Sequence, residues 1–314
     1  MVVDFNNGAI SLQSLFIVVG VVASIIIAII LFLVGLARLA SYKMLSPPRL
    51  KKNWTPKDLG HDYENVEVTT SDGYRLRGWF IDKGSDTTIV AIHGYTASKY
   101  EEDYMKPVID MLARNGYNVV AFDFRAHGDS DGEITTLGLK EVEDYMRIID
   151  WLKSEKPDRA GKIGVIGYSM GGAVTIMLSA KDKRINAAVA DSPYIDIRES
   201  GRRWIMRLKG IMRSLLLLVY PLIVRFTASR AGINIDDLIM YKYADNIKIP
   251  FMIIAGRNDD LVALSEIKKF YDKLRRNNPK AILWVTDSGH VHTIKDHPRE
   301  YEEKVIGFFK EYLG

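Results

Sequence analysis

Residues 163–172 constrain the fold of this chain more than any other stretch, because a short β-branched run leads there into a Gly-x-Ser-x-Gly pattern. The serine is Ser169, and a helix-compatible run follows at residues 173–180. On such a strand–turn–helix junction the serine hydroxyl projects from the edge of a sheet, and the flanking glycines admit neighbouring backbone that a Cβ would block. We therefore predict that Ser169 is a nucleophile. Because five-residue patterns also recur by chance in loops, this prediction depends on partners elsewhere in the chain.

Strand and helix patterns alternate on both sides of this serine. Residues 64–70 and 74–81 are β-rich and are joined by a Ser-Asp-Gly turn, so they are expected to form an antiparallel hairpin. Further strands are predicted at residues 88–92, 117–122, 163–168, 185–190, 250–255 and 282–285. Helices are expected at residues 98–116, where Ser98 and Glu101 fit a capping box, and at residues 136–156. Continuous apolar strands separated by helices predict an eight-stranded, mostly parallel sheet covered on both faces.

A serine at neutral pH becomes a good nucleophile when a histidine takes its proton and a carboxylate orients that histidine. Asp259 follows the strand at 250–255, and His290 follows the strand at 282–285. Both lie just past the carboxyl ends of strands, where open α/β sheets gather their sites, and they follow the serine in the order found in α/β-hydrolases. Ser169, Asp259 and His290 are therefore the predicted catalytic residues. Two other acidic residues, Asp260 and Asp191, remain open as alternatives to Asp259. Two other histidines remain open as alternatives to His290: His292, which is expected to be partly buried, and His297, which is expected to be solvated.

The oxyanion that develops during acyl transfer needs two backbone N–H donors. One candidate is the N–H of Met170, at the start of the helix that follows the serine. The other is the N–H of Tyr95, which follows a His-Gly dipeptide at the end of a strand. Three polar side chains near these positions are expected only to hold their loops: His93, Arg125 and His127.

These residues carry a resemblance to the α/β-hydrolase superfamily, in its Bem46/ABHD13-like branch, close to the serine aminopeptidase S33-type hydrolases. The matching motifs run from about residue 56 to the C-terminus and include Asp72-Gly73-Tyr74, Asp123-x-Arg125-x-His127-Gly128, residues 167–172, Asp191-Ser192-Pro193-Tyr194, Gly256-x-x-Asp259 and Gly289-His290. The family pattern has glycine where this chain has Ala126. The resemblance implies a serine hydrolase that acts on esters, with Ser169, Asp259 and His290 at the matching positions. No cofactor or metal is expected.

A long apolar run lies near the N-terminus. No charged residue occurs between Asp4 and Arg38, and residues 15–37 are almost entirely Ile, Val, Leu, Ala and Phe. As a helix this run is about 34 Å long, enough to cross about 30 Å of bilayer hydrocarbon. A cleaved signal peptide would have a basic flank and a shorter apolar core, and a buried core helix would be shorter and less uniform. An uncleaved transmembrane anchor is therefore predicted.

Charge asymmetry predicts the orientation of this anchor. Six basic residues follow it before the first acidic residue: Arg38, Lys43, Arg49, Lys51, Lys52 and Lys57. By the positive-inside rule the catalytic part is expected on the cytoplasmic side of the cell membrane, held by a single span. The anchor is assigned to residues 1–40. A stiff basic juxtamembrane linker, able to contact anionic headgroups, is assigned to residues 41–57.

Residues 193–247 form an insertion far longer than a helical crossover requires. The segment is rich in arginine and contains an apolar run at residues 215–224, which is too short and too broken by proline to span a bilayer. A helical cap over the active site is predicted here, between the two parts of a hydrolase core at residues 58–192 and 248–314. Two interpretations stay open: a cap with a solvated basic face, or a basic amphipathic surface that lies on the membrane.

Composition excludes several kinds of protein. The net charge of +4 is too weak to indicate a nucleic-acid partner, and no nucleic-acid-binding motif is present. The chain has no cysteine, which excludes a disulfide framework, a thiolate nucleophile and a cysteine-ligated zinc site.

We therefore predict a membrane-anchored serine hydrolase, an esterase or lipase that cleaves carboxylic esters through an acyl-enzyme. The apolar cap and anchor suggest lipid-like substrates such as a monoacylglycerol or a lysophospholipid. The expected partners are that ester and the lipid bilayer. The alternatives are an aminopeptidase-type hydrolase, which would need an acidic pair in a cap that is basic, and a catalytically inactive membrane-tethered scaffold. Acyl-chain length and oligomeric state do not follow from the sequence.

Overall fold

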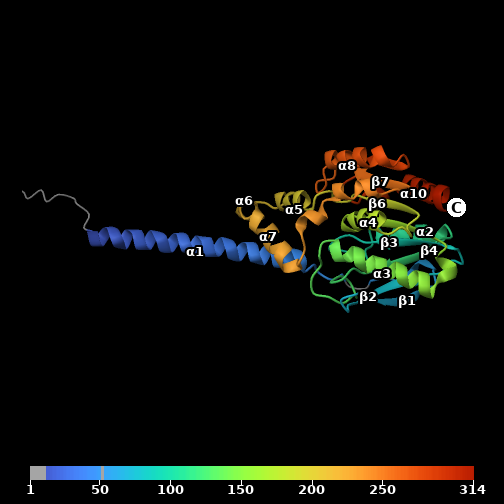
Figure 1. Cartoon of the computed structure of the whole chain (residues 1–314), viewed down its shortest axis with the longest axis horizontal. Helices are drawn as coiled ribbons and strands as arrows, with labels where there is room; N and C mark the ends of the chain where they lie inside the picture. The colour runs from blue at the N-terminus through green and yellow to red at the C-terminus, as the bar shows by residue number, and fades with distance from the viewer. Residues whose placement is uncertain (1–11, 51–52) are drawn as a thin grey trace, which may run out of the picture.

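The computed structural model describes residues 12–50 and 53–314, and its centre is one eight-stranded sheet (Figure 1). The strands are β1 (Glu64–Thr69), β2 (Arg75–Ile81), β3 (Thr87–Ile92), β4 (Asn118–Phe122), β5 (Lys162–Tyr168), β6 (Ala187–Asp191), β7 (Phe251–Gly256) and β8 (Ala281–Thr286). Their order is β1-β2-β4-β3-β5-β6-β7-β8. The pairs β1–β2 and β2–β4 are antiparallel, and all other pairs are parallel. The predicted fold class is confirmed.

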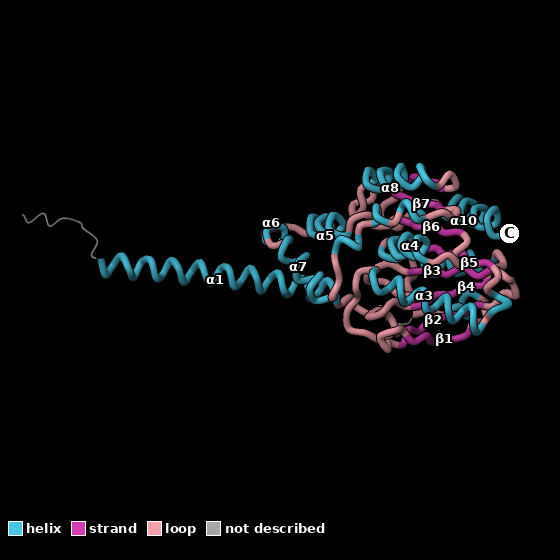
Figure 2. Tube along the Cα trace, viewed as in Figure 1, coloured by secondary structure: helices cyan, strands magenta, loops and turns pink. Residues whose placement is uncertain are grey.

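Helices cover both faces of the sheet (Figure 2). On β3, Val90 and Ile92 belong to one buried cluster, and Ile89 and Ala91 belong to the other, because successive side chains of a strand point to opposite faces. The first cluster includes the apolar sides of α3 (Leu139–Glu155), α4 (Met170–Lys181) and α8 (Leu264–Asn277). The second includes those of α2 (Met105–Arg114) and α10 (Pro298–Leu313), with the short α9 (Thr293–Asp296) before it.

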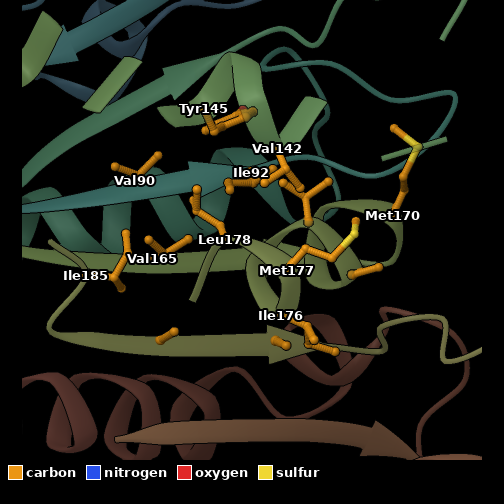
Figure 3. Close-up of a cluster of buried hydrophobic side chains, with 14 of the residues drawn as sticks. Val90, Ile92, Val142, Tyr145, Val165, Met170, Ile176, Met177, Leu178 and Ile185 are labelled. Atoms are coloured by element: carbon orange, nitrogen blue, oxygen red, sulfur yellow. The ribbon is translucent and has the colours of Figure 1, made fainter. Parts of the chain in front are cut away.

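The helix α4 is buried over nearly its whole length, which fixes the turn that precedes it. In the close-up of this core, Leu178 of α4 lies beside Val165 of β5, and Met177 lies farther along the helix near Ile176 (Figure 3). Residues 170–179 are all buried. Because α4 and β5 are both packed in the core, the position of the short turn between them is fixed at both ends.

The helix predicted at residues 98–116 begins later than expected. In the structure α2 starts at Met105, and residues 98–104 form turns. The Glu101 carboxylate accepts hydrogen bonds from the N–H groups of Tyr104 (2.8 Å) and Met105 (3.4 Å), so it caps α2 instead of pairing with Ser98 in a capping box. The third helix is also shorter, running over Leu139–Glu155 rather than residues 136–156.

The N-terminal apolar run forms one long helix, α1 (Leu12–Leu45), which projects from the rest of the molecule (Figure 1). It is long and apolar enough to cross a membrane. The helix continues through the first residues of the segment assigned to the linker, because Ser41 and Leu45 are buried against the rest of the protein. Residues 1–11 of the predicted anchor, and Lys51 and Lys52 of the predicted linker, lie outside the described residues.

The part of the linker that follows α1 is docked on the sheet domain rather than free. The Arg49 guanidinium donates to the backbone carbonyls of Gly128 (2.8 Å), Ser130 (2.6 Å) and Gly132 (2.7 Å), in the loop after β4. This charge is therefore held by the protein and not available to a headgroup.

Residues 193–247 contain three helices, α5 (Ile197–Met206), α6 (Ile211–Leu218) and α7 (Tyr220–Ala231), followed by short 3₁₀ turns at Ile235–Leu238, Met240–Lys242 and Ala244–Asn246. Two more 3₁₀ turns lie at Pro56–Leu59 and Pro157–Arg159. Residues 193–247, which we call the cap segment after their predicted role, pack on the C-terminal part of α1. A third buried cluster joins Ala37 of α1 to Ile205 of α5, Leu216 of α6, Ile223 of α7 and Val219 between α6 and α7.

Candidate active site

Ser169 occupies the sharp turn between β5 and α4. Its φ of 53° lies in the left-handed region, which costs a non-glycine residue roughly 1–2 kcal/mol. The turn is held because the Ser169 N–H donates to the Asp191 carbonyl at 2.9 Å, at the end of the neighbouring strand. Close packing requires glycine at two flanking points: a Cβ on Gly171 would meet the His93 carbonyl oxygen, and one on Gly94 would lie 3.3 Å from the Ser169 Cβ.

The structure brings Ser169, His290 and Asp259 into one hydrogen-bonded chain. His290 Nε2 lies 2.8 Å from Ser169 Oγ, and His290 Nδ1 lies 2.7 Å from Asp259 Oδ2. The other carboxylate oxygen, Oδ1, accepts from the N–H groups of Leu261 and Val262, each at 2.8 Å. Because both Asp259 oxygens are occupied, the carboxylate is fixed and orients the imidazole with Nδ1 protonated and Nε2 facing the serine.

Two loops that follow neighbouring strands supply this acid and this histidine. Backbone hydrogen bonds link them, from the Arg257 N–H to the Thr286 carbonyl at 2.8 Å and from the Asn258 N–H to the Ser288 carbonyl at 3.1 Å. The approach is so close that a Cβ on Gly256 would collide with the Ser288 carbonyl. The distance between Asp259 and His290 is thus set by the backbone of β7 and β8.

The structure separates the rival residues from this chain of hydrogen bonds. Asp260 is exposed and forms an ion pair with Arg207 of the cap segment at 3.1 Å. His297 lies 2.6 Å from Asp287, away from the serine. His292 is exposed, so the expectation that it is partly buried was wrong. It precedes α9 on the solvent side, whereas the next residue, Thr293, takes the buried position.

Asp191 is fully buried at the end of β6 beside the serine turn. Its carboxylate accepts hydrogen bonds from Ser192 Oγ (2.9 Å) and Tyr301 Oη (3.1 Å), whereas the hydrogen bond to His290 Nδ1 comes from Asp259. Burial raises the pKa of Asp191 to about 6. In this structure it supports the turn through its backbone and does not orient the histidine.

The predicted oxyanion donors lie beside the serine, at the ends of β3 and β5. Within the described residues, no hydrogen bond engages the N–H of Tyr95 or of Met170. The preceding Gly94 N–H is different, because it donates to Tyr104 Oη at 3.0 Å. An oxyanion hole requires two backbone N–H groups that are free to donate, and these two meet that condition.

The polar side chains beside these donors hold the loops, as the sequence suggested. His93 is buried and neutral, its pKa lowered by burial, and its Nε2 accepts from the Phe124 N–H at 3.0 Å. Arg125 forms ion pairs with Asp144 (2.6 Å) and Asp72 (2.8 Å). Ala126 has a φ of 61°, a left-handed conformation that explains why glycine is the usual residue there.

Sequence reasoning missed two contacts at the site. Tyr104, which is half-buried and packs beside Tyr168, fixes the Gly94 N–H. The Tyr95 hydroxyl donates to the Met44 carbonyl at 2.8 Å, in the last turn of α1. Burial raises the pKa of Tyr95 to about 12, so the phenol stays protonated as this donor. No local pattern predicts either contact, since each joins segments far apart in the chain.

The arrangement has the groups needed for hydrolysis through a covalent serine intermediate: a nucleophile, a base, an orienting acid and two N–H donors. The sequence profile of the X-Pro dipeptidyl-peptidase (S15) family matches residues 45–216, more than half of the chain, and that of the prolyl oligopeptidase family matches residues 225–314. The chain belongs to the α/β-hydrolase superfamily.

Individual proteins similar to this chain agree with this assignment. The solved esterase Pf2001 of Pyrococcus furiosus is 42% identical, with a TM-score of 0.76 over 87% of this chain and 100% of that one. The α/β-hydrolase domain-containing protein WAV2 of Arabidopsis thaliana is 25% identical over 84% of this chain and 85% of its own. A Saccharomyces cerevisiae relative described as a membrane protein is 24% identical over 77% of this chain and 78% of its own. The Bem46/ABHD13-like branch stays a prediction.

Proposed function

We propose that this α/β-hydrolase is a membrane-anchored serine esterase. The observation that carries the proposal is the hydrogen-bonded chain from Asp259 through His290 to Ser169 Oγ, on a turn flanked by two unengaged N–H groups. The similarity to an esterase at 42% identity over 87% of the chain supports carboxylic esters as the substrate class.

The proposed reaction has two steps. His290 Nε2 takes the Ser169 hydroxyl proton while Oγ attacks the ester carbonyl carbon, and the carbonyl oxygen becomes an oxyanion held by the Tyr95 and Met170 N–H groups. The tetrahedral intermediate collapses, the alkoxide leaves with the proton from His290, and an acyl-Ser169 ester remains. Water then repeats the sequence in place of the serine, releasing the carboxylic acid, while Asp259 stabilises the imidazolium.

The setting of the site supports a lipid-like ester, such as a monoacylglycerol or a lysophospholipid. The exposed apolar helix α1 and the apolar cap helices lie on the same side of the molecule (Figure 1). The basic residues that follow the apolar run favour a cytoplasmic location for the catalytic part, with α1 as a single span of the cell membrane. Equal rates on water-soluble short-chain esters and on micellar long-chain esters would contradict a lipid-like substrate.

Substitution of the nucleophile tests the proposed chemistry. Ser169→Ala should lower hydrolysis of p-nitrophenyl esters by more than about 10³-fold, because removing the nucleophile of a triad leaves only binding and oxyanion stabilisation. It should also abolish labelling by a fluorophosphonate probe. Ser179→Ala, which removes a buried serine hydroxyl of the following helix α4, should leave both unchanged. Turnover retained in Ser169→Ala would overturn the assignment, and an unlabelled wild-type protein would favour an inactive scaffold.

A peptidase is the second candidate, because both matching family profiles are named for peptidases. Binding a peptide N-terminus requires acidic groups free to pair with its ammonium. In the cap segment Asp196 and Asp236 are both paired with Arg198, at 2.8 Å and 3.0 Å, which disfavours this reading. Cleavage of aminoacyl p-nitroanilides at rates similar to those of p-nitrophenyl esters would favour the peptidase.

A further inference from the structure

The cap segment carries an apolar surface that nothing in the structure covers. It consists of six large side chains exposed by between 37% and 74%, which we call the exposed cap face: Trp204, Met206, Ile211, Met212, Leu218 and Leu222. Outside α1 and the cap segment, the described residues include only three large apolar side chains exposed to a similar degree: Leu50, Tyr74 and Ile282. Exposed apolar side chains gathered on one part of a surface indicate an interaction site.

The position of this face relative to α1 identifies what it contacts. Residues 12–32 of α1 are exposed throughout, whereas from Leu33 onward the helix packs on the cap helices. The bare part is about 32 Å long, which matches about 30 Å of bilayer hydrocarbon. If α1 spans the bilayer, the membrane surface therefore falls where the cap begins, and α6 lies beside α1 at that level (Figure 1).

The charges around the exposed cap face fit an anionic headgroup layer. Glu199 is the only acidic residue between positions 197 and 235. Lys209 and Arg213 flank the start of α6, and neither forms an ion pair with any described residue. A basic rim around apolar side chains, with an exposed tryptophan, is typical of helices that lie in the membrane interface.

The geometry of α6 and α7 argues against a second membrane span. The two helices contain 8 and 12 residues and are bent by 62° at the break between them. Val219 and Ile223 on their inner side are buried against α1 and α5. The pair thus presents one apolar side to the protein and the other outward, as an interfacial helix does.

We propose that the exposed cap face is a membrane-binding surface, which inserts α6 and the turn before it into the anionic headgroup layer beside α1. The cap then forms the contact between the catalytic domain and the bilayer from which a lipid ester would be drawn. The surface rests on the proposed span of α1 but not on the proposed catalytic chemistry.

The absence of cysteine permits a direct test in the full-length chain. Two variants, Leu218→Cys and Ile211→Cys, would each be labelled with an environment-sensitive fluorophore. Each labelled protein would be placed, at one copy per disc, in nanodiscs of either phosphatidylglycerol or phosphatidylcholine. Ile282→Cys, on the last strand of the sheet and away from the cap, is the matched control. Nitroxides attached to the lipids should quench the cap labels at least about threefold more strongly than the control label. Iodide in the aqueous phase should quench the control label more strongly than the cap labels.

The charge contribution is tested in the same nanodiscs. Lys209→Gln together with Arg213→Gln should reduce nitroxide quenching at Leu218→Cys in phosphatidylglycerol and leave the weaker quenching in phosphatidylcholine unchanged. Cap labels that iodide reaches as readily as the control label would overturn the proposal. A label shielded from both quenchers, or shielded only at several copies per disc, would instead indicate a protein partner or a second copy. Because the readout is fluorescence and not activity, it is unaffected by Ser169→Ala. The result therefore tests the membrane-binding surface independently of the esterase proposal.

Discussion

Backbone strain in this protein is concentrated at single residues next to the site. Thr96, Ser169, Ser192 and Val291 all have φ between 50° and 60°, although none is glycine. Each of the four follows a different strand and lies at or next to a residue of the site. Ser169 is the nucleophile itself, and the other three come directly after Tyr95, Asp191 and His290. A left-handed conformation costs such residues about 1–3 kcal/mol each, so the surrounding packing must impose it. Four strand ends are thereby turned sharply toward one point.

The buried Asp191 gives a prediction about pH. Burial raises its pKa to about 6, above the ordinary value of about 3.9. The folded protein therefore binds this proton more tightly than the unfolded chain does. Compared with a protein that has a neutral residue at this position, the wild type therefore loses folding stability as the pH rises from about 4 to about 6. Asp191→Asn should remove that loss, which is about 3 kcal/mol.

Thermal unfolding in detergent between pH 4 and pH 7 checks this expectation. The unfolding temperature of Asp191→Asn should rise relative to the wild type across that interval. Asp272→Asn, at an exposed position on α8, serves as the control and should show no such change. Wild-type and Asp191→Asn curves that stay parallel would contradict the prediction.

At this scale the sequence predicts most of the site, because its residues directly follow strands. Ser169, Asp259 and His290 were identifiable since parallel strands end at one edge of the sheet. Which acid contacts the histidine is decided by the backbone bonds between two loops, which no pattern in the sequence reveals. The same holds for Tyr104, whose hydroxyl takes the Gly94 N–H.

Among the elements, α1 makes the least expected contact. Its last turn accepts a hydrogen bond from Tyr95, the residue whose N–H is a proposed oxyanion donor. The Thr135 N–H donates to the Leu45 carbonyl at 2.9 Å, and Thr227 of α7 contacts Met44. The end of the N-terminal helix is thus tied both to the loop after β3 and to the cap.

Removing the tyrosine hydroxyl tests whether this tie positions the oxyanion loop. Tyr95→Phe should lower kcat about 3- to 10-fold, in line with one lost hydrogen bond of about 1 kcal/mol, and leave KM nearly unchanged. Ester hydrolysis with a soluble substrate provides both values. Tyr243→Phe removes a comparable bond to the Asp237 carbonyl (2.9 Å) and should leave kcat as it is. A rise in KM alone for Tyr95→Phe would mean that the hydroxyl only shapes the pocket.

Element boundaries were harder to predict than the elements themselves. The apolar run ends at Ala37 and the linker is predicted to begin at Ser41, yet the helix continues to Leu45. Contacts with the cap stabilise these last turns, including Arg38 over the Phe226 ring and Arg230 over the Tyr42 ring. Tertiary packing of this kind overrides local composition.

At the scale of the whole molecule, α1 has two parts with different roles. Residues 12–32 are exposed throughout, whereas Ala37, Ser41 and Leu45 are buried. The eight-stranded topology could be predicted from the alternation of strands and helices in the sequence. The packing of α1 on the cap segment could not, because it joins the N-terminal segment to an insertion some 180 residues away.

Two truncations separate these parts. A chain that starts at residue 33 should keep its esterase activity and its unfolding temperature in detergent. A chain that starts at residue 46 loses Ala37 and Leu45 from buried clusters, which should lower the free energy of unfolding by about 3 kcal/mol or more. Thermal unfolding and p-nitrophenyl ester hydrolysis of both forms check this. Equal stability of the two forms would show that the helix contributes nothing to the fold beyond residue 32.

The unbroken passage from α1 into the cap also fixes how the protein searches for substrate. A catalytic domain on a flexible tether samples a hemisphere of solvent, whereas here the last turns of the helix are part of the domain itself. In the proposed orientation the Ser169 turn stays at one constant height above the lipid surface, and the protein diffuses in two dimensions. Its rate would then depend on the mole fraction of substrate in the bilayer and would fall on dilution with inert lipid, even at constant bulk concentration.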